Sequence, residues 1–417
     1  MKTLHFLATL LFLAAPMFCQ AIEVRLSVKF IRNNDASGTH PSGDIGTEAT
    51  FATEINRGNA VLAATGRGYE LKVVEYRDIQ PAAPIAAAVN FTGGTTQNSA
   101  TVTCSNTAGL QVNMFVQGAG IPANSVIDSI VPNTSFALLS RATATNASVA
   151  MSASFPANFW FDLPARARRA FIEAAATATP QAKVTWMWND NAINIYVNNS
   201  RSGSCAFVGE GLSIALGDNV GVGTVLHEIG HFLDLHHTHA GDYVIPTPTT
   251  FTLASLTNGD GLDETLEDNP DISTNDQLSN ARFGVPYTQP PTPPNAPFAT
   301  PSERAQVDSA FENVMSYHNE NTLLSVQMDI WTLSANVGRL VFCNGRTWFV
   351  ANGGNNGAAG NSAATPLSTL VSGMQHVTTS NDVVLLRNGT YTTPPVGIIS
   401  TQCTLRATRG PVTIIQP

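Results

Sequence analysis

The sequence has few charged residues. Asp, Glu, Lys and Arg make up 12% of its 417 residues, about half the share that is usual in a soluble domain. Disorder does not follow, because 43% of the residues are hydrophobic and Thr, Ser, Asn and Gly fill the polar positions. The 21 basic residues are outnumbered by 30 acidic ones. This balance excludes nucleic acid as a partner, since its binding requires a basic surface.

Long apolar runs are also missing beyond the N-terminus. Residues 4–18 are mostly apolar, Lys2 precedes them, and Cys19 and Ala21 follow. This run is shorter than the ~20 residues that a membrane-spanning helix needs, and its layout is typical of a cleaved signal peptide. We therefore expect residues 1–21 to be a signal peptide, the protein to be secreted or held at the cell surface, and no segment to span a membrane.

Cysteine is scarce as well. Four cysteines follow the expected signal peptide, at positions too scattered for a zinc–thiolate cluster: Cys104, Cys205, Cys343 and Cys403. Export would allow any of three disulfide pairings, or free thiols.

The remaining pattern mixes strands and helices, which predicts an α+β protein. Alternating or β-branched runs predict strands at residues 24–31, 69–76, 184–188 and 194–197. Apolar residues at helical spacing predict helices at residues 47–64, 163–176, 224–235, 302–311 and 323–336. Two segments read as irregular: a glycine-dotted loop at 200–223, and an acidic, then proline-rich stretch at 240–300.

Two segments differ in style from the rest. Between residues 81 and 155 only Asp128 and Arg141 are charged, and short β-branched runs alternate with turn residues. This composition predicts a small all-β insert, with a long decorated loop as the alternative. Residues 346–417, with WFVANGG and DVVLLRNGTY, resemble the start of a right-handed parallel β-helix of the pectate-lyase-like type, cut off after one or two rungs.

The strongest motif is HEIGHFLDLHHTH at residues 227–239. His227 and His231 are four residues apart and project from one face of the expected helix. Two neutral imidazoles at that spacing can bind one zinc ion. Glu228 lies roughly 100° around the helix from His227. It can therefore reach a metal-bound water and act as general base, then acid, without being a ligand.

The string resembles that of the metzincin zinc metallopeptidases, of the pappalysin or cytophagalysin type. The resemblance implies a metzincin-like catalytic domain, with a mixed twisted sheet and an active-site helix, over residues 22–345 apart from the insert. It also implies that His237 is the third zinc ligand. His236 and His239 are the alternatives and are expected to face solvent or the cleft wall. Asp234 stands where the family has glycine, and Asp is among the few residues that tolerate a positive φ.

Residues 313–317, NVMSY, resemble the methionine turn of the same family. The resemblance implies that Met315 packs beneath the three histidines as an apolar floor. It also implies that Tyr317 points its hydroxyl toward the metal and stabilises the oxyanion during turnover. Residues 324–328, LSVQM, resemble the helix that follows this turn.

An acidic stretch at residues 259–265, GDGLDET, resembles a conserved segment that the family carries between the two motifs. Glu264 replaces an Asp and Leu266 replaces a Pro of that pattern. Oxygen atoms of Asp260, Asp263 and Glu264 could bind calcium. A solvated acidic loop is the alternative.

These features predict a secreted endopeptidase that uses Zn²⁺, and at the acidic stretch Ca²⁺, to hydrolyse protein or peptide substrates. The alternative is a surface-adhesive protein that uses the protease fold and the β-modules as a scaffold and binds cell-surface glycans. A polysaccharide lyase or hydrolase built on the β-helix would need further rungs.

Overall fold

The computed structural model describes residues 22–33, 38–199, 203–208, 210–221, 223–239, 260, 262, 272–291, 293, 296–316, 321–335, 339, 342–343, 345–362, 364–380, 382–392 and 401–415. The expected signal peptide, Asp263, Glu264 and Tyr317 lie outside the described residues. Within these ranges the chain is a mixed α and β protein with three separate sheets, consistent with the predicted α+β class. None of the described helices is long and apolar enough to cross a membrane.

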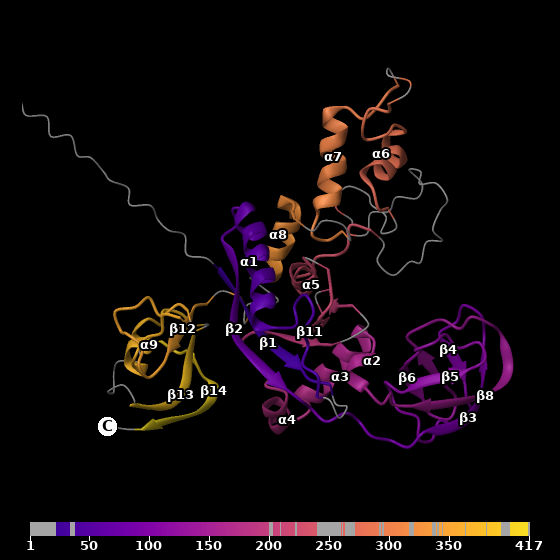
Figure 1. Ribbon diagram of the computed structural model, residues 1–417. Coiled ribbons are helices and arrows are strands. Elements are labelled where there is room, and N and C mark those ends of the chain that lie inside the picture. Colours follow the sequence, from indigo (N-terminus) through magenta and orange to yellow (C-terminus); the bar gives the residue numbers. More distant parts are fainter. Residues whose placement is uncertain are drawn as a thin grey trace, which may run out of the picture.

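A five-stranded sheet forms the centre of the molecule (Figure 1). Four of its strands run parallel to their neighbours, and the edge strand β10 is antiparallel to β11. The strand order is β10 (Cys205–Phe207), β11 (Glu210–Gly217), β9 (Ile193–Asn198), β1 (Ile22–Ile31) and β2 (Tyr69–Ile79).

Helix α1 (Glu48–Ala64) connects β1 to β2. The side chain of Thr47 accepts a hydrogen bond from the backbone N–H of Thr50, which caps the first turn. Gly66 and Gly68, both at positive φ, follow the last turn.

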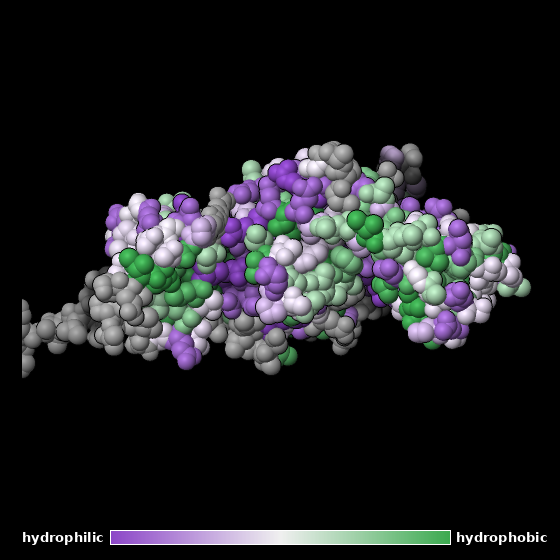
Figure 2. Space-filling model, turned by 90° about the horizontal axis from the view of Figure 1, so that it is seen from below, coloured by the Kyte–Doolittle hydropathy of each residue, from purple (hydrophilic) through white to green (hydrophobic). Residues whose placement is uncertain are grey.

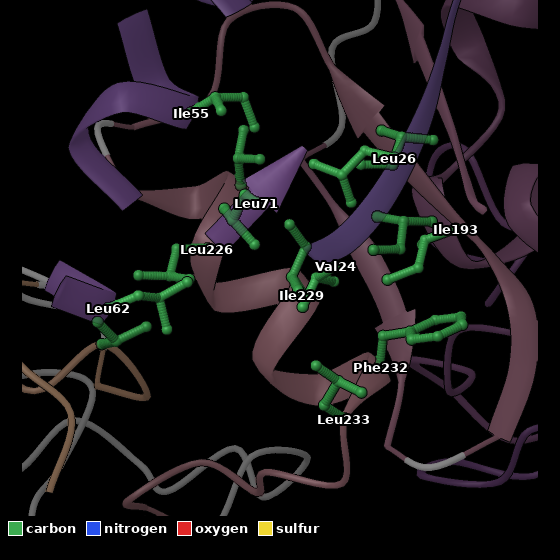
Figure 3. Close-up of a cluster of buried hydrophobic side chains, with 14 of the residues drawn as sticks. Val24, Leu26, Ile55, Leu62, Leu71, Ile193, Leu226, Ile229, Phe232 and Leu233 are labelled. Carbon is green, nitrogen blue, oxygen red and sulfur yellow. The ribbon is translucent and has the colours of Figure 1, made fainter. Parts of the chain in front are cut away.

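One face of this sheet packs on α1 and on α5 (Thr224–Phe232) to form the main core. Alternate residues of β1 and β9, such as Val24, Leu26 and Ile193, point toward Ile229 and Phe232 of α5 (Figure 3). Each large apolar side chain buried in this way stabilises the fold by about 1.5–3 kcal/mol. The core therefore fixes α5, which carries the zinc-type motif, against the sheet.

The opposite face of the sheet is covered as well, by three short helices and an aromatic cluster. Trp160, Trp186 and Tyr196 pack edge to face there. The helices are α2 (Phe159–Asp162), α3 (Ala165–Thr177) and α4 (Pro180–Thr185).

The strand expected at residues 184–188 is wrong. Thr179 caps α4 and Pro180 occupies its first turn, so the apolar run begins inside a helix. The chain then reverses at Met187, whose φ is 49°.

Residues within the expected insert form a six-stranded antiparallel sheet with a core of its own, to one side of the central sheet (Figure 1). Phe136, Met151 and Val102 are buried at its centre. The strands are β3 (Val89–Thr95), β4 (Thr101–Thr103), β5 (Phe115–Gly118), β6 (Ile127–Val131), β7 (Ser135–Leu138) and β8 (Asn146–Ser154).

The third sheet lies on the other side of the central one (Figure 1) and consists of parallel strands β12 (Thr347–Val350), β13 (Val383–Thr392) and β14 (Thr404–Ile415). Helix α9 (Leu370–Gln375) precedes β13. Phe349 and Leu385 of this module pack on Val74 of β2. Cys104, Cys205, Cys343 and Cys403 are free thiols.

Three further helices lie beyond α5: α6 (Asn275–Phe283), α7 (Pro301–Glu312) and α8 (Ser325–Leu333). Helix α6 falls in the stretch expected to be largely irregular. Thr274 and Gln277 form a capping box at its start, and Gly284 ends it at positive φ.

Candidate metal centre

Helix α5 brings His227 and His231 to one face, one turn apart, and both are buried. The helix ends at Phe232, earlier than the expected residue 235. Asp234 then adopts a φ of 70°, as its place in the motif predicts. This left-handed residue reverses the chain direction, so the residues that follow return toward the helix.

The reversal brings His237 to the two helical histidines. Its Nε2 lies 3.0 Å from Nε2 of His231 and 3.2 Å from Nε2 of His227. Within the described part of the chain, these residues are the one group of three or more His, Cys, Asp or Glu side chains placed to hold a metal ion.

The three nitrogens fit a tetrahedral metal ion. Ligand nitrogens about 2.0–2.1 Å from zinc are roughly 3.3–3.4 Å apart, close to the observed separations. Nδ1 of His227 lies 2.7 Å from the carbonyl oxygen of Val314, and Nδ1 of His231 lies 2.7 Å from that of Leu235. Because a carbonyl can only accept, each Nδ1 carries the proton, and each Nε2 keeps a lone pair for a metal.

The charge state of the cluster also suits a metal. Burial, together with the neighbouring histidines, lowers the pKa of His227 to about 3 and that of His231 to about 4. The pKa of His237 is lowered further, by burial and by His231 and His227. All three imidazoles are therefore neutral near pH 7, the form that binds metal.

The two alternative histidines occupy different environments. His236 is exposed. His239 is only 1% exposed, and its ring stacks on that of His237, with centroids 4.8 Å apart and planes at 11°. Of the two positions expected for His239, solvent is therefore excluded. His239 packs against His237 and restricts the orientation of that ring.

The carboxylate of Glu228 lies against the edge strand β10. Its Oε2 accepts a hydrogen bond from the backbone N–H of Ala206 at 2.5 Å. Burial raises the pKa of Glu228 to about 7, although hydrogen bonds from the Ser204 side chain and the Ala206 N–H act in the opposite direction. A carboxyl group with this pKa can both take and return a proton near neutral pH.

Sequence reasoning missed these partners of Glu228. Residues 200–223 were expected to be a loop, whereas they contain β10 and β11. The mostly apolar segment at residues 212–216 could have indicated a strand, but the glycines on either side of it favoured the prediction of a loop.

The turn that contains Met315 packs beneath α5. Met315 is fully buried, and a Cβ placed on Gly230 would meet its Sδ at 2.6 Å. Asn313 holds the turn: its Oδ1 accepts from the N–H of Met315, and its amide exchanges two hydrogen bonds with the Gln327 amide. The Thr238 N–H donates to the carbonyl of Met315, which ties the turn to the segment carrying His237.

Among the residues named for calcium, the structure places Asp260 alone. It is half-buried, its Oδ1 accepts a hydrogen bond from the N–H of Leu262, and it lies in a small recess near His236. The calcium site stays a prediction, as does the role of Tyr317.

Searches for similar proteins found no match among models of known families, curated proteins or solved structures. The geometry of the site therefore carries the functional interpretation.

Proposed function

We propose that this chain is a secreted zinc-dependent endopeptidase with a metzincin-like catalytic domain of the pappalysin or cytophagalysin type. The observation that carries the proposal is the convergence of three neutral histidine Nε2 atoms beside a buried glutamate. His227, His231 and His237 would hold the ion. When bound, zinc supplies a Lewis acid that polarises a peptide carbonyl and lowers the pKa of water to about 7.

Glu228 is the group that moves protons. Its pKa of about 7 allows it to accept a proton from the attacking water and to give it to the leaving amine. The Ala206 N–H and the Ser204 side chain fix its carboxylate. Tyr317 would stabilise the oxyanion, which predicts that Tyr317→Phe lowers turnover while zinc stays bound.

The edge strand β10 gives the substrate a place beside Glu228. In the described residues β10 pairs with β11 alone, so apart from the Ala206 N–H, which donates to Glu228, its other edge can pair with an extended peptide. Since Ala206 belongs to β10 and contacts Glu228, a peptide aligned on this edge would lie next to the general base. This arrangement favours protein or peptide substrates.

Cleavage of casein tests the proposal. Wild-type protein should cleave casein in a chelator-sensitive manner, and Glu228→Ala should abolish cleavage. His236→Ala is the matched control, because His236 is exposed and lies outside the cluster; it should retain activity. Zinc-loaded protein that cleaves neither casein nor a broad peptide panel would refute the proposal.

A second candidate function rests on the insert. A shallow hollow of about 660 Å³ on β3, β5 and β8 has Phe91 and Met151 in its wall, with amide and hydroxyl groups beside them and no charged residue. Such a lining suits an uncharged glycan. We propose glycan binding here as the alternative or additional activity. Glycan binding should be retained in Glu228→Ala and lost in Phe91→Ala. Glycan binding that is lost in Glu228→Ala and retained in Phe91→Ala would exclude this function.

We further propose that β12, β13 and β14 begin a right-handed parallel β-helix. All three strands pair in parallel, and large apolar residues such as Val350, Val384 and Leu386 share one core. Strands stacked in this way are typical of solenoids.

A further inference from the structure

The second face of the central sheet carries a polar cluster that the proposed function does not use. Leu26 pairs with Val73, whereas Ser27 pairs with Glu75, so Val74 is an extra residue in β2. This bulge turns Glu75 to the face opposite α1 and α5. Without it, the charge would point into the apolar core.

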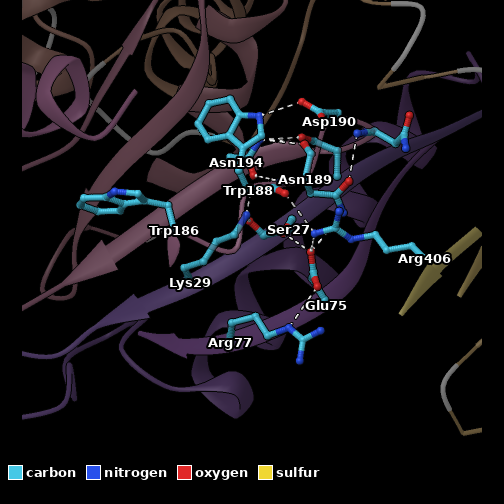
Figure 4. Close-up of polar contacts among 12 residues, drawn as sticks. Ser27, Lys29, Glu75, Arg77, Trp186, Trp188, Asn189, Asp190, Asn194 and Arg406 are labelled. Carbon is cyan, nitrogen blue, oxygen red and sulfur yellow. Dashed lines mark hydrogen bonds and ion pairs between the residues drawn. The ribbon is translucent and has the colours of Figure 1, made fainter. Parts of the chain in front are cut away.

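Glu75 accepts hydrogen bonds from two arginines, one on its own strand and one from the distant strand β14. Arg77 of β2 donates from Nε at 3.1 Å, and Arg406 of β14 donates from Nη2 at 2.9 Å. Figure 4 shows Glu75 between the two side chains. Ser27 and Asn189 also donate to its Oε1, at 2.6 and 3.1 Å. Three protein donors thus reach Oε1, and Nε of Arg77 reaches Oε2.

Positive charge exceeds negative charge here. Arg77 and Arg406 are permanently charged, yet both pair with the same carboxylate. The adjacent pair of Lys183 and Asp190 is neutral as a unit. In the part of the chain that the structure describes, Arg77 donates from Nε alone, and Nε of Arg406 is buried without a hydrogen-bond partner. Among the described residues, two arginines therefore share the single Glu75 carboxylate, and one positive charge has no carboxylate of its own.

The pKa shifts of Glu75 and Lys29 agree with this balance of charges. Burial alone would raise the pKa of Glu75, but the charge of Arg406, together with the Ser27 hydrogen bond and the charge of Arg77, outweighs it and lowers the pKa to about 2. Glu75 is therefore ionised at any ordinary pH. The Nζ of Lys29 donates to Asn194 rather than to Glu75, and burial lowers the pKa of Lys29 well below its usual range.

The cluster opens into a hollow of about 530 Å³ between α4 and β14. Three apolar residues, Val184, Met187 and Leu405, are 62%, 39% and 42% exposed at its rim, beside the Lys183–Asp190 ion pair. Figure 2, which views the molecule from this side, shows strongly hydrophilic surface where the C-terminal module meets the rest of the protein, with hydrophobic surface beside it. A sugar would need amides and hydroxyls at the rim, whereas hydrocarbon suits apolar side chains.

We propose that this hollow binds an acidic, apolar peptide segment, whose carboxylate pairs with Arg77 and Arg406 and whose apolar side chains pack on Val184, Met187 and Leu405. The excess arginine charge favours a ligand with a carboxylate. The exposed apolar side chains at the rim favour a ligand with apolar side chains next to that carboxylate. The hollow lies on the face of the sheet opposite α5. Binding therefore requires neither metal nor Glu228, and it stands or falls independently of the proteolytic function.

Fluorescence anisotropy with a labelled peptide of alternating glutamate and leucine tests the proposal. Full-length Glu228→Ala protein is used, so that the probe stays intact. Saturable binding is expected, weakened about tenfold or more by replacing glutamate with glutamine in the probe. Arg77→Gln should weaken it similarly. Arg141→Gln is the matched control, because Arg141 is exposed on the insert, and it should bind as the parent does.

A second variant keeps the test decisive if Arg77→Gln fails to fold. Leu405→Ser changes an exposed rim residue and should weaken binding of the leucine-containing peptide. It should weaken binding less for a probe in which serine replaces leucine, because that probe lacks the apolar side chains that contact Leu405. No saturable binding of the alternating peptide, or equal binding of its glutamine form, would overturn the proposal. So would stronger binding of an acidic oligosaccharide than of the peptide.

Discussion

Replacing Gly230 with alanine tests the contact between helix α5 and the turn below it. The new Cβ would lie 2.6 Å from Sδ of Met315 and 3.4 Å from Cδ1 of Leu235. An ordinary carbon–sulfur contact is about 1 Å longer than the first distance. Met315 is fully buried, so its side chain, the turn or the helix must shift.

Two effects of opposite sign set the magnitude. Overpacking of this kind costs about 1–3 kcal/mol, whereas Gly to Ala inside a helix gains about 1 kcal/mol. We expect Gly230→Ala to lower the free energy of unfolding by about 1 kcal/mol. In a Met315→Ala background the clash is absent, and the same change should raise it by up to about 1 kcal/mol. The coupling between the two positions is then about 2 kcal/mol.

Urea unfolding of the wild type, both single variants and the double variant measures this coupling directly. Zinc affinity gives a second readout, because a shifted helix moves His227 and His231. If Gly230→Ala is stabilising in both backgrounds, helix propensity alone explains the position. Met315 then does not support the site in the way that the structure indicates.

Three further predictions concern the same region. Asp234→Gly should raise the free energy of unfolding by about 1 kcal/mol, because glycine adopts the observed φ of 70° without strain; a lower melting temperature would contradict this. Gln327→Ala should cost about 1–3 kcal/mol and weaken zinc binding, since it removes the acceptor of the buried Asn313 Nδ2 and one of the two donors to its Oδ1; unchanged urea midpoint and affinity would show that the turn needs no such support. In metal-free protein, His227 and His231 have pKa values lowered to about 3 and 4, so between pH ~6.5 and ~4 the unfolded chain binds more protons. As the pH decreases through this range, the free energy of unfolding should decrease, by up to about 1.4 kcal/mol per pH unit for each histidine. Glu228, with its pKa raised to about 7, acts in the opposite direction, because its folded form binds one more proton than its unfolded form between about pH 4.5 and 7. A free energy of unfolding that rises as the pH decreases would contradict the prediction.

Local patterns predicted much of the central fold. The alternation in β1 and the apolar helical spacing of α1 and α3 each specify their element within a few residues. The convergence of His227, His231 and His237 follows from spacing and from one residue at positive φ. These are short-range signals, which a sequence carries explicitly.

Long-range packing was not visible in the same way. The alternation in β1 suggests one polar face, yet Arg25 and Lys29 are buried. They are covered because α4 and the third sheet pack on that face, and because Asn194 and the Asn191 carbonyl accept from them. Such partners lie far along the chain, so no local pattern indicates them.

The same reason explains the misassigned segments. Residues 184–188 have the composition of a strand, but Thr179 and Pro180 start a helix that includes the first of them. The strand β11 carries glycines at both ends, Gly211 and Gly217, which made it resemble a loop. Because β10 lies in the same segment and was also predicted to be a loop, the contact between Ala206 and Glu228 could not be predicted either.

Metal analysis of purified, zinc-reconstituted protein tests the central claim most directly. Wild type and Glu228→Ala should each retain one zinc ion per chain after dialysis. His237→Ala should lose most of it, because it removes the Nε2 that lies 3.0 and 3.2 Å from the other two, while His236→Ala should keep it. Wild-type protein without zinc, or His237→Ala with as much zinc as the wild type, would contradict the account.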